Sequence, residues 1–273
     1  MSEKRRRARV QGGWASTSKP RRDEGPTKIA NKDEKYPINF KFKPTVENRS
    51  KPKELVIKKN GVHQLSDTDN GLSRIFLQNE FFDSNECEWI FEQLHAEVPW
   101  KQELIKIKGE TVEQPRHTAW FGDITYTYSG LTLNPHQFSP LLIMIRDKIE
   151  SYMNEQQINR VPFNSMLANL YRGEKDSIDW HSDDEVSLQR NPVIASLSFG
   201  ETRNFELRRK DQSEIIDGEV DYTYSQHVKV PLSNGSLLIM DGACQEDWQH
   251  RVPKEYHDRQ PRINLTFRTI YPS

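Results

Sequence analysis

From Phe163 onward, the sequence consists of short segments with the pattern of β-strands. Gly, Asn and Pro turns separate these segments, as is typical of strands that follow one another along a chain. We expect strands around residues 166–171, 193–199, 203–208, 222–230, 237–240 and 264–270. This arrangement favours a double-sheet barrel or jelly roll.

Two helices are expected before these strands. Asp83-Ser84 predicts a helix start, and apolar residues follow at helical spacing as far as Val98. Ser139-Pro140 is a good cap and first-turn pair for the second helix. The expected buried positions of the second helix are Leu142, Ile145, Ile149 and Tyr152. Helices followed by many strands predict an α+β domain.

Residues 1–68 differ in composition from the rest of the chain. They are rich in Lys, Arg, Pro, Ser and Asn without a sustained period, which predicts a mostly disordered arm. Residues 1–60 hold 18 Lys and Arg against 7 Asp and Glu, a net charge of +11, whereas the remaining residues carry −12. Basic arms of this kind contact nucleic acid or act as nuclear-import signals, and residues 4–9 are the candidate run. A merely solvated tail is the alternative.

The folded domain is expected to cover residues 69–273, with order beginning near Leu72. Trp14, within the arm, is a candidate anchor for a partner. The two cysteines, Cys87 and Cys244, match no zinc or redox spacing and are typical of a reducing compartment. No apolar run approaches the roughly 18 residues that a membrane helix needs. We expect a soluble monomer of the nucleus and cytoplasm.

The stretch Trp180-His181-Ser182-Asp183-Asp184 indicates a metal site. His181 and Asp183 are two residues apart, so in extended backbone their side chains leave the same face. With a second imidazole, this pair would make the facial triad that binds iron(II) and leaves coordination positions open. By itself, His-x-Asp is a weak signal that usually marks a solvated turn.

His250 is the best candidate for the second imidazole. Its same-face neighbours, Trp248 and Val252, are apolar, so we expect its side chain to point inward. His257 lies in a charged segment and is expected in an exposed loop. His227 shares a face with polar side chains and is expected to be solvated.

The segment before the carboxyl end alternates cleanly between apolar and polar residues. Its polar face carries Arg262, Asn264, Thr266 and Arg268. Burying two guanidinium groups costs several kcal/mol each unless carboxylates meet them, and a bound dicarboxylate would meet them bidentately. The polar outer face of an edge strand is the alternative interpretation.

An earlier strand places an amide and a phenol together, because Leu167, Asn169 and Tyr171 share a face. These two polar groups would suit the same ligand. They could equally be satisfied polar groups of the core.

In this order, Asn169-Leu170-Tyr171, His181-Ser182-Asp183, His250 and the segment from Arg262 to Arg268 resemble the AlkB family of iron(II)- and 2-oxoglutarate-dependent dioxygenases. The likeness covers about residues 72–273. It implies a double-stranded β-helix fold, with iron(II), 2-oxoglutarate and O₂ as cofactor and cosubstrates. It also implies oxidative demethylation of alkylated bases, with release of succinate, CO₂ and formaldehyde.

The resemblance assigns roles to these residues. It implies that iron(II) is held by His181, Asp183 and His250. It implies that the distal carboxylate of 2-oxoglutarate pairs with Arg262, helped by Asn169 and Tyr171. Arg268 would orient the carboxylate on the iron side and Asp183.

The resemblance implies 1-methyladenine and 3-methylcytosine in single-stranded DNA or RNA as substrates. Both bases are cationic and cannot pair normally, so they are easily exposed. An electron-rich slot is then expected. Its candidates are Trp100 and the segment Tyr126-Thr127-Tyr128, with Asp184 as a carboxylate partner for the base. For Trp100, the alternative is a core anchor after the first helix.

Further expectations concern the surroundings of the site. Residues 98–130 are expected to form a nucleotide-recognition lid, in which a hairpin at residues 103–113 sets strand selectivity. Leu167 is a candidate for self-hydroxylation near the iron. The resemblance also implies a helicase of the activating signal cointegrator complex as a partner.

Two other functions remain open from the residues alone. One is 2-oxoglutarate-dependent hydroxylation of a protein side chain, which would use the same triad. The other is a non-catalytic nucleic-acid-binding module. Zinc hydrolysis is disfavoured, because the sequence has no His-Glu-x-x-His.

Overall fold

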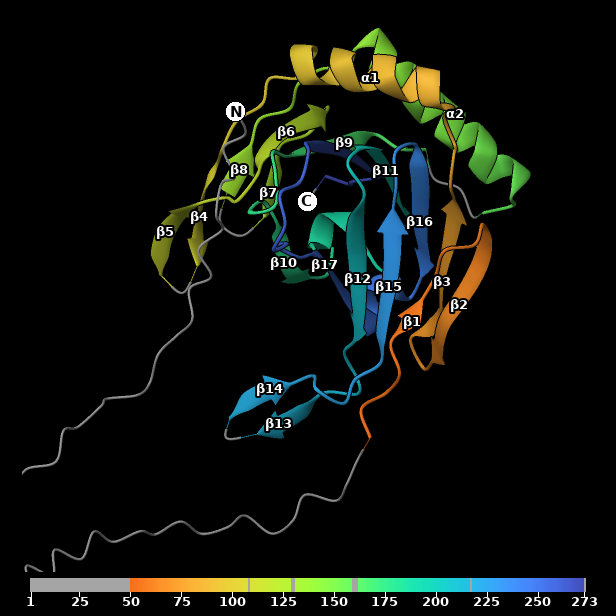
Figure 1. The fold of residues 1–273 in the computed structure, drawn as a ribbon, viewed down its shortest axis with the longest axis vertical. Coiled ribbons are helices and arrows are strands. Elements are labelled where there is room, and N and C mark those ends of the chain that lie inside the picture. Colours follow the sequence, from red (N-terminus) through yellow and green to blue (C-terminus); the bar gives the residue numbers. More distant parts are fainter. Residues whose placement is uncertain (1–49, 108, 129–130, 159–161, 217, 273) are drawn as a thin grey trace, which may run out of the picture. The chain divides into compact units, whose positions relative to one another are not determined.

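The computed structural model describes residues 50–272, apart from residues 108, 129–130, 159–161 and 217 (Figure 1). These residues belong to one compact unit, Glu47–Ser273. The expectations for residues 4–9 and for Trp14 lie outside the described residues. Within the described part, no helix is long and apolar enough to cross a membrane.

Two large sheets form the centre of the fold, as the jelly-roll prediction requires. The order of the seven-stranded sheet is β2 (Gly61–Thr68), β3 (Gly71–Gln78), β16 (Ser236–Gly242), β11 (Ile194–Gly200), β18 (Arg262–Arg268), β9 (Ser165–Tyr171) and β6 (His117–Gly122). The order of the five-stranded sheet is β1 (Leu55–Val56), β15 (His227–Leu232), β12 (Arg203–Arg209), β17 (Trp248–Val252) and β10 (Ile178–His181).

Three two-stranded hairpins accompany the large sheets. They are β4 (Leu104–Ile107) with β5 (Glu110–Glu113), β7 (Tyr126–Tyr128) with β8 (Leu131–Leu133), and β13 (Glu214–Ile216) with β14 (Glu219–Asp221). The first of them confirms the hairpin expected at residues 103–113. The remaining elements are α3 (Cys244–Asp247) and a short 3₁₀ turn (Val186–Leu188).

Both faces of the seven-stranded sheet carry buried apolar side chains, and this places the sheet in the middle of the fold. On one face, Ile75 and Leu238 pack in a core cluster with Phe205 and Val228 of the five-stranded sheet. On the other face, side chains such as Ile239 pack in a second cluster with buried residues of two helices. Layers of helices, sheet and sheet result, since each face needs an apolar cover.

The helices α1 (Ser84–Glu97) and α2 (Pro140–Glu155) cover the seven-stranded sheet (Figure 1). Asp83 caps α1, because its carboxylate accepts from the backbone N–H of Glu86. Ser139 caps α2 as expected. The fourth buried residue of α2 is Met153, while Tyr152 is only partly buried and packs edge-on against Phe81.

The folded domain begins earlier than expected. β1 pairs in parallel with β15, and β2 pairs with β3, so residues 55–68 belong to the sheets and not to the arm. β2 is an edge strand with mostly polar or exposed residues, and few apolar side chains are needed to hold it. Ile57 and Leu65 are nevertheless buried.

Candidate metal centre and its cavity

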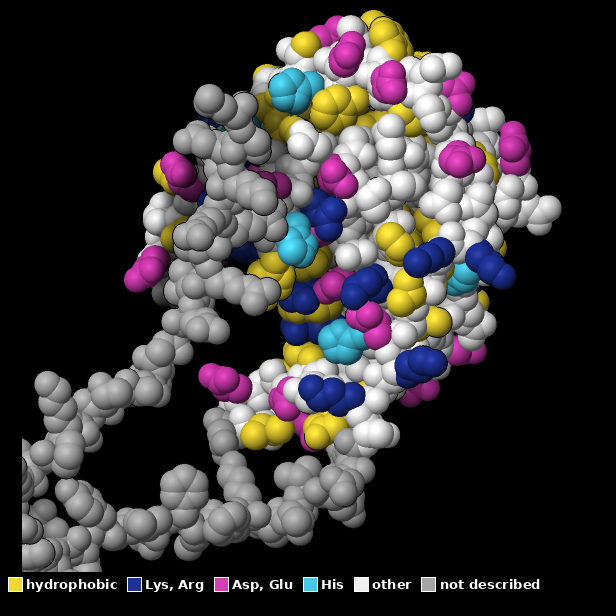
Figure 2. Space-filling model, viewed as in Figure 1, with side chains coloured by type: hydrophobic (Ala, Val, Ile, Leu, Met, Phe, Trp, Pro, Cys, Tyr) yellow, Lys and Arg dark blue, Asp and Glu magenta, His cyan; other side chains and the backbone are white. Residues whose placement is uncertain are grey.

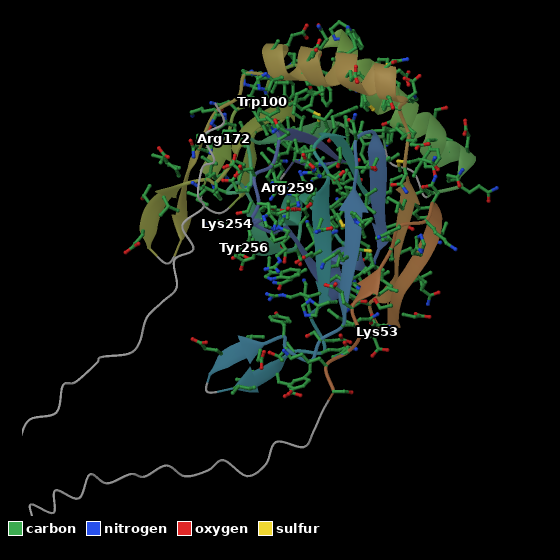
Figure 3. The ribbon with its side chains drawn as sticks, viewed as in Figure 1. Lys53, Trp100, Arg172, Lys254, Tyr256 and Arg259 are labelled. Carbon is green, nitrogen blue, oxygen red and sulfur yellow. The ribbon has the colours of Figure 1, made fainter. Side chains whose placement is uncertain are left out.

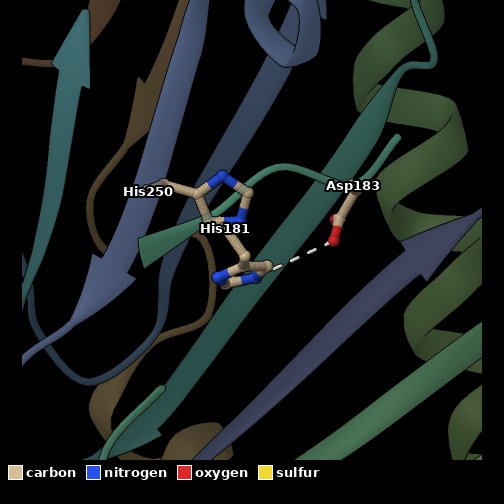
Figure 4. Close-up of side chains that lie close together, drawn as sticks. All are labelled: His181, Asp183 and His250. Carbon is tan, nitrogen blue, oxygen red and sulfur yellow. Dashed lines mark ion pairs between the residues drawn. The ribbon is translucent and has the colours of Figure 1, made fainter. Parts of the chain in front are cut away.

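The two candidate histidines face each other across neighbouring strands. β10 pairs with β17 in the five-stranded sheet, and His181 lies directly opposite His250 in this register. Their ring centroids are 4.2 Å apart. Directly opposed residues on one face of an antiparallel pair bring their side chains together. Asp183 lies two residues after the end of β10 (Figure 4).

The three side chains form a set that can hold a metal ion. One potential ligand atom from each of His181, Asp183 and His250 lies within 4.8 Å of the others, and no other such group occurs among the residues that the structure describes. The His181 Nε2 is 3.8 Å from an Asp183 carboxylate oxygen. Asp183 and His250 are buried, whereas His181 is partly exposed, so access to the set is from the His181 side.

Neighbouring groups orient each member of the triad. The His181 Nδ1 is 2.8 Å from the backbone oxygen of Asp179, so Nε2 is left for a ligand when Nδ1 carries the proton. His250 stacks on Phe205 with an interplanar angle of 25°. The Asp183 backbone N–H donates to Gln245 Oε1 at 3.0 Å. Such contacts fix ring and carboxylate orientation before a metal binds.

The protonation states of the triad suit a metal ion. Burial, with His181 close by, lowers the pKa of His250 to about 3. Desolvation also lowers the pKa of His181. Both imidazoles are therefore neutral at neutral pH and offer lone pairs. Burial acts to raise the pKa of Asp183, but Arg268, through its positive charge and its hydrogen bonds, outweighs burial and holds that pKa well below its usual range.

Arg268 is placed as expected beside the triad. Its Nε and Nη2 donate to the same Asp183 oxygen at 3.1 and 2.8 Å. Both side chains are buried, so this ion pair acts in a low-dielectric site. The second Asp183 oxygen is the one that faces His181 and remains for a metal.

The triad lines a cavity between the two large sheets, together with the polar face of β18. The residues that line this cavity are Leu167, Asn169, Tyr171, Ile178, His181, Asp183, Ser196, Phe205, Met240, His250, Val252, Arg262, Asn264, Thr266 and Arg268. All four expected 2-oxoglutarate residues and Leu167 are among them. In the β9–β18 register, Arg262 pairs with Tyr171 and Asn264 with Asn169. The polar face of β18 is thus an inner face, which excludes the exposed edge-strand alternative.

Arg262 fits a buried anion. Its Nη2 donates to Ser198 Oγ at 2.8 Å, but its Nε and Nη1 have no hydrogen-bond partner among the described residues. No carboxylate of the described part forms an ion pair with it. Burial, and then the nearby Arg203, lower its pKa to about 10, although Tyr171 opposes this shift. Buried N–H donors without acceptors are costly, so a carboxylate ligand suits the site.

Arg116 is a buried residue of the site that the sequence patterns did not indicate. It precedes β6, and its Nε donates to Asn169 Oδ1 at 2.9 Å. Its positive charge also contributes to the lowered pKa of His181. Because Arg116 lies outside any alternating segment, only its position in the fold shows that it orients Asn169.

Of the expected base-binding residues, Trp100 and Asp184 are not among the residues that line the cavity. Trp100 packs against the helix-side core cluster, and its Nε1 donates to the backbone oxygen of His95 at 3.2 Å (Figure 3). These are the contacts of the core-anchor alternative. Asp184 is exposed next to the triad and acts electrostatically on Lys210. For Tyr126-Thr127-Tyr128, the structure describes the pairing of β7 with β8 but not the side chains.

Comparisons with known proteins agree with this geometry. The family model described as the 2OG-Fe(II) oxygenase superfamily matches residues 75–268. The chain is 49% identical over 289 residues to "Alpha-ketoglutarate-dependent dioxygenase alkB homolog 3" of Bos taurus, covering 100% of this chain and 98% of the relative. It is 36% identical over 194 residues to "DNA oxidative demethylase ALKBH2" of Homo sapiens, covering 69% of this chain and 70% of the relative.

A solved structure of OsALKBH1 has a similar fold. It superposes with a TM-score of 0.51 at 16% identity, covering 71% of this chain and 97% of that chain. At this identity the likeness concerns the fold, and it agrees with the double-sheet core described above.

Proposed function

The chain belongs to the AlkB family of 2-oxoglutarate- and iron(II)-dependent dioxygenases, and we propose that it oxidatively removes methyl groups from 1-methyladenine and 3-methylcytosine in single-stranded DNA and RNA. One observation carries the proposal. The His181–Asp183–His250 set lines the same cavity as Arg262, which forms no ion pair with a carboxylate of the described residues. A metal and a dicarboxylate can therefore be held side by side.

The triad would hold the iron. Two neutral nitrogens and one carboxylate are the donor set of the facial triads that bind iron(II) with open positions. When bound, iron(II) and 2-oxoglutarate supply an O₂-dependent oxidation that yields succinate and CO₂ and hydroxylates the N-methyl group. Arg268 keeps Asp183 ionised and fixes which of its oxygens faces the metal position.

The polar face of β18 would hold 2-oxoglutarate. Arg262, with its unsatisfied N–H groups and neighbouring Tyr171, suits the distal carboxylate. Asn169, held by Arg116, lies on the same inner face. The low-dielectric surroundings strengthen these charge-assisted hydrogen bonds.

The nucleic-acid part of the proposal is supported by the activities for which the relatives are named. The human relative is named a DNA oxidative demethylase. In our proposal, the base enters from the partly exposed His181 side. Asp184 is the carboxylate that meets the cationic base, because it follows the triad residue Asp183 and is exposed there. The β4–β5 hairpin, within the expected lid, governs strand selectivity.

The experiment is turnover with iron(II) and 2-oxoglutarate on matched oligonucleotides that carry one methylated base. Single-stranded DNA, duplex DNA and RNA are compared by formaldehyde release. We expect turnover on the two single strands and less on the duplex. Asp184→Ala should lower kcat/KM on methylated bases, whereas the control Asp147→Ala, which removes an exposed carboxylate of α2, should not. Decarboxylation of 2-oxoglutarate without any demethylation would instead favour a protein side chain as the substrate.

Three finer features belong to the same proposal. We infer self-hydroxylation at Leu167, because its buried side chain lines the cavity with the triad. A gain of one oxygen on this residue, found by mass spectrometry after substrate-free turnover, would support it.

We also propose a nuclear and cytoplasmic location and an arm contact with a helicase of the activating signal cointegrator complex. Fractionation and co-precipitation with and without the arm test these.

A further inference from the structure

The outer side of strand β10 carries a cluster of aromatic and cationic side chains. β10 is the edge strand of the five-stranded sheet, and Trp180 directly precedes His181 on it. Successive side chains of a strand point to opposite faces. Therefore His181 lines the cavity, while Trp180 contacts residues on the outer face of the same sheet.

The cluster is built around Arg208, and we call it the Arg208 stack. The Arg208 guanidinium carbon is 4.5 Å from the ring centroid of Trp180 and 3.6 Å from that of Tyr222. Arg251 lies 4.3 Å from the Trp180 centroid, and His227 meets the same indole edge-on at 6.0 Å. Figure 2 shows Lys, Arg and His side chains gathered over β12, β15 and β17.

Arg208 forms no ion pair with a carboxylate of the described residues, although the charge of Asp179 acts on it at longer range. Its Nε and Nη2 both donate to the neutral Gln249 Oε1, at 2.9 and 2.7 Å. By contrast, the neighbouring Arg251 pairs with Glu206 at 2.8 Å, and Lys229 pairs with Glu54 at 3.0 Å. The stack thus holds a fixed guanidinium that forms no direct ion pair with a carboxylate of the described residues.

A groove runs beside the stack. Arg208, Tyr222 and His227 line it together with Lys51. Two carboxylates also line the groove, but Glu54 is paired with Lys229, and Asp221 accepts hydrogen bonds from the backbone and hydroxyl of Thr223. A groove with cations and aromatic rings is the combination that single-stranded nucleic acid requires.

We propose that the Arg208 stack and its groove bind the phosphodiester backbone of the strand that carries the target base. The stack lies on the other face of the strand that supplies His181, and His181 is the partly exposed member of the triad. A nucleic acid that reaches the cavity from this side must pass the β10 edge, next to Trp180. This inference rests on the proposed function and adds a second contact surface to it.

The test compares Arg208→Gln with the wild type on two substrates with the same methylated base. One is a trinucleotide, and the other is a single strand of about 15 nucleotides, which is long enough to leave the cavity. The measured quantity is the ratio of kcat/KM on the long strand to kcat/KM on the trinucleotide. We expect this ratio to be about tenfold lower in Arg208→Gln than in the wild type, because the variant loses one phosphate contact. The salt slope of binding to an unmethylated strand should fall by about 0.7.

Two further variants separate charge from packing. Arg208→Lys keeps the charge and should keep the salt slope, even if its stacking is poorer. Arg146→Ala removes another stacked arginine and should behave as the wild type. Arg146 lies on α2, and its guanidinium carbon is 5.5 Å from the ring centroid of Phe138. Thermal unfolding of each variant checks that the fold is kept.

The outcomes distinguish the two proposals. A wild type that turns over neither substrate contradicts the proposed function itself. A wild type active on both, with an unaltered long-to-short ratio in Arg208→Gln, overturns only the inference about the stack. If Arg208→Gln weakened the binding of polyglutamate as much as the binding of the nucleic-acid strand, the inference would also be overturned. The surface would then bind acidic peptides.

Discussion

At the scale of single residues, Arg262 shows how the chemistry depends on burial. Its guanidinium is fully enclosed, and only one of its nitrogens has a protein acceptor among the described residues. A surface arginine with the same groups would be satisfied by water. In the cavity, the unsatisfied N–H groups favour a carboxylate ligand.

Replacing Arg262 by Gln should raise the KM for 2-oxoglutarate about 10- to 100-fold, since hydrogen bonds to charged groups contribute about 1.5–3 kcal/mol. At saturating 2-oxoglutarate, kcat should fall much less. Initial rates over a range of 2-oxoglutarate concentrations provide the measurement. Arg209→Ala, at an arginine paired with Asp211 outside the cavity, is the control. An unaltered KM would show that Arg262 does not bind the cosubstrate.

His250 predicts the pH dependence of stability in the metal-free protein. Its pKa is about 3 when folded and near 6.5 otherwise, so between these values the unfolded chain binds more protons. The contribution of His250 to the free energy of unfolding is therefore fully present above about pH 6.5. It is lost as the pH falls toward 3, by at most about 1.4 kcal/mol per pH unit. His181 acts in the same direction.

Urea unfolding at about pH 7 and about pH 5 with a chelator present measures this effect. The wild type should lose more stability between the two pH values than His250→Gln does. Equal losses in the two proteins would mean that His250 is not titrating in this window.

At the scale of elements, Asp247 joins α3 to the β2–β3 hairpin. Its buried carboxylate accepts hydrogen bonds from four side chains: Ser66, Thr68, Asn70 and Ser73. Burial acts to raise its pKa, but Asn70 and the three hydroxyls outweigh this and lower it. Trp248, which follows α3 and begins β17, donates through its Nε1 to Ser66 Oγ at 2.9 Å. The edge hairpin is thereby tied to the strand that carries His250.

Asp247→Ala should reduce the free energy of unfolding by about 2–4 kcal/mol, because four donors, of which Ser66 and Ser73 are buried, lose their shared acceptor. Chemical denaturation at neutral pH measures it. Asp147→Ala removes an exposed carboxylate paired with Arg146 and should change stability by less than about 0.5 kcal/mol. A change of that small size in Asp247→Ala as well would show that the hairpin does not depend on this clamp.

At the scale of the whole molecule, the charge is unevenly distributed along the chain. Residues 1–49 contain 14 Lys and Arg against 6 Asp and Glu, while the whole chain carries −1. The rest of the chain is therefore acidic and repels a polyanion at long range. In our proposal, binding of nucleic acid then relies on local cations such as Arg208 and on the amino-terminal residues.

Deleting residues 1–49 should weaken binding to an unmethylated single strand and flatten its salt dependence, because fewer counterions are released. The deletion stops before β1, whose pairing with β15 would otherwise be lost. Fluorescence anisotropy at several salt concentrations gives both quantities. A chain in which the basic residues at 4–9 are replaced by Gln tests whether that run is responsible. Unaltered salt dependence in the deletion would exclude a role for the arm.

Local patterns were sufficient for features that depend on neighbours in the chain. The caps Asp83 and Ser139 define helix starts, because the hydrogen bonds that they make are local. The alternation in β18 correctly separates Ile263 from Arg262. Patterns did not identify β2, whose polar edge position needs few apolar residues, or Arg116, whose partner Asn169 lies in another strand.

The sequence by itself determined which side chains leave a strand together, as His181 and Asp183 do, because alternation is a property of the extended backbone. It also determined, through residues that resemble the AlkB family, which chemistry to look for. Only the tertiary structure decided that His250 lies opposite His181 and that Arg262 faces the cavity. It also decided that Arg208 and Arg251 stack on Trp180 at the other face of the sheet. The physical reason is that strand register between distant segments is set by the packing of two whole sheets, which no local pattern contains.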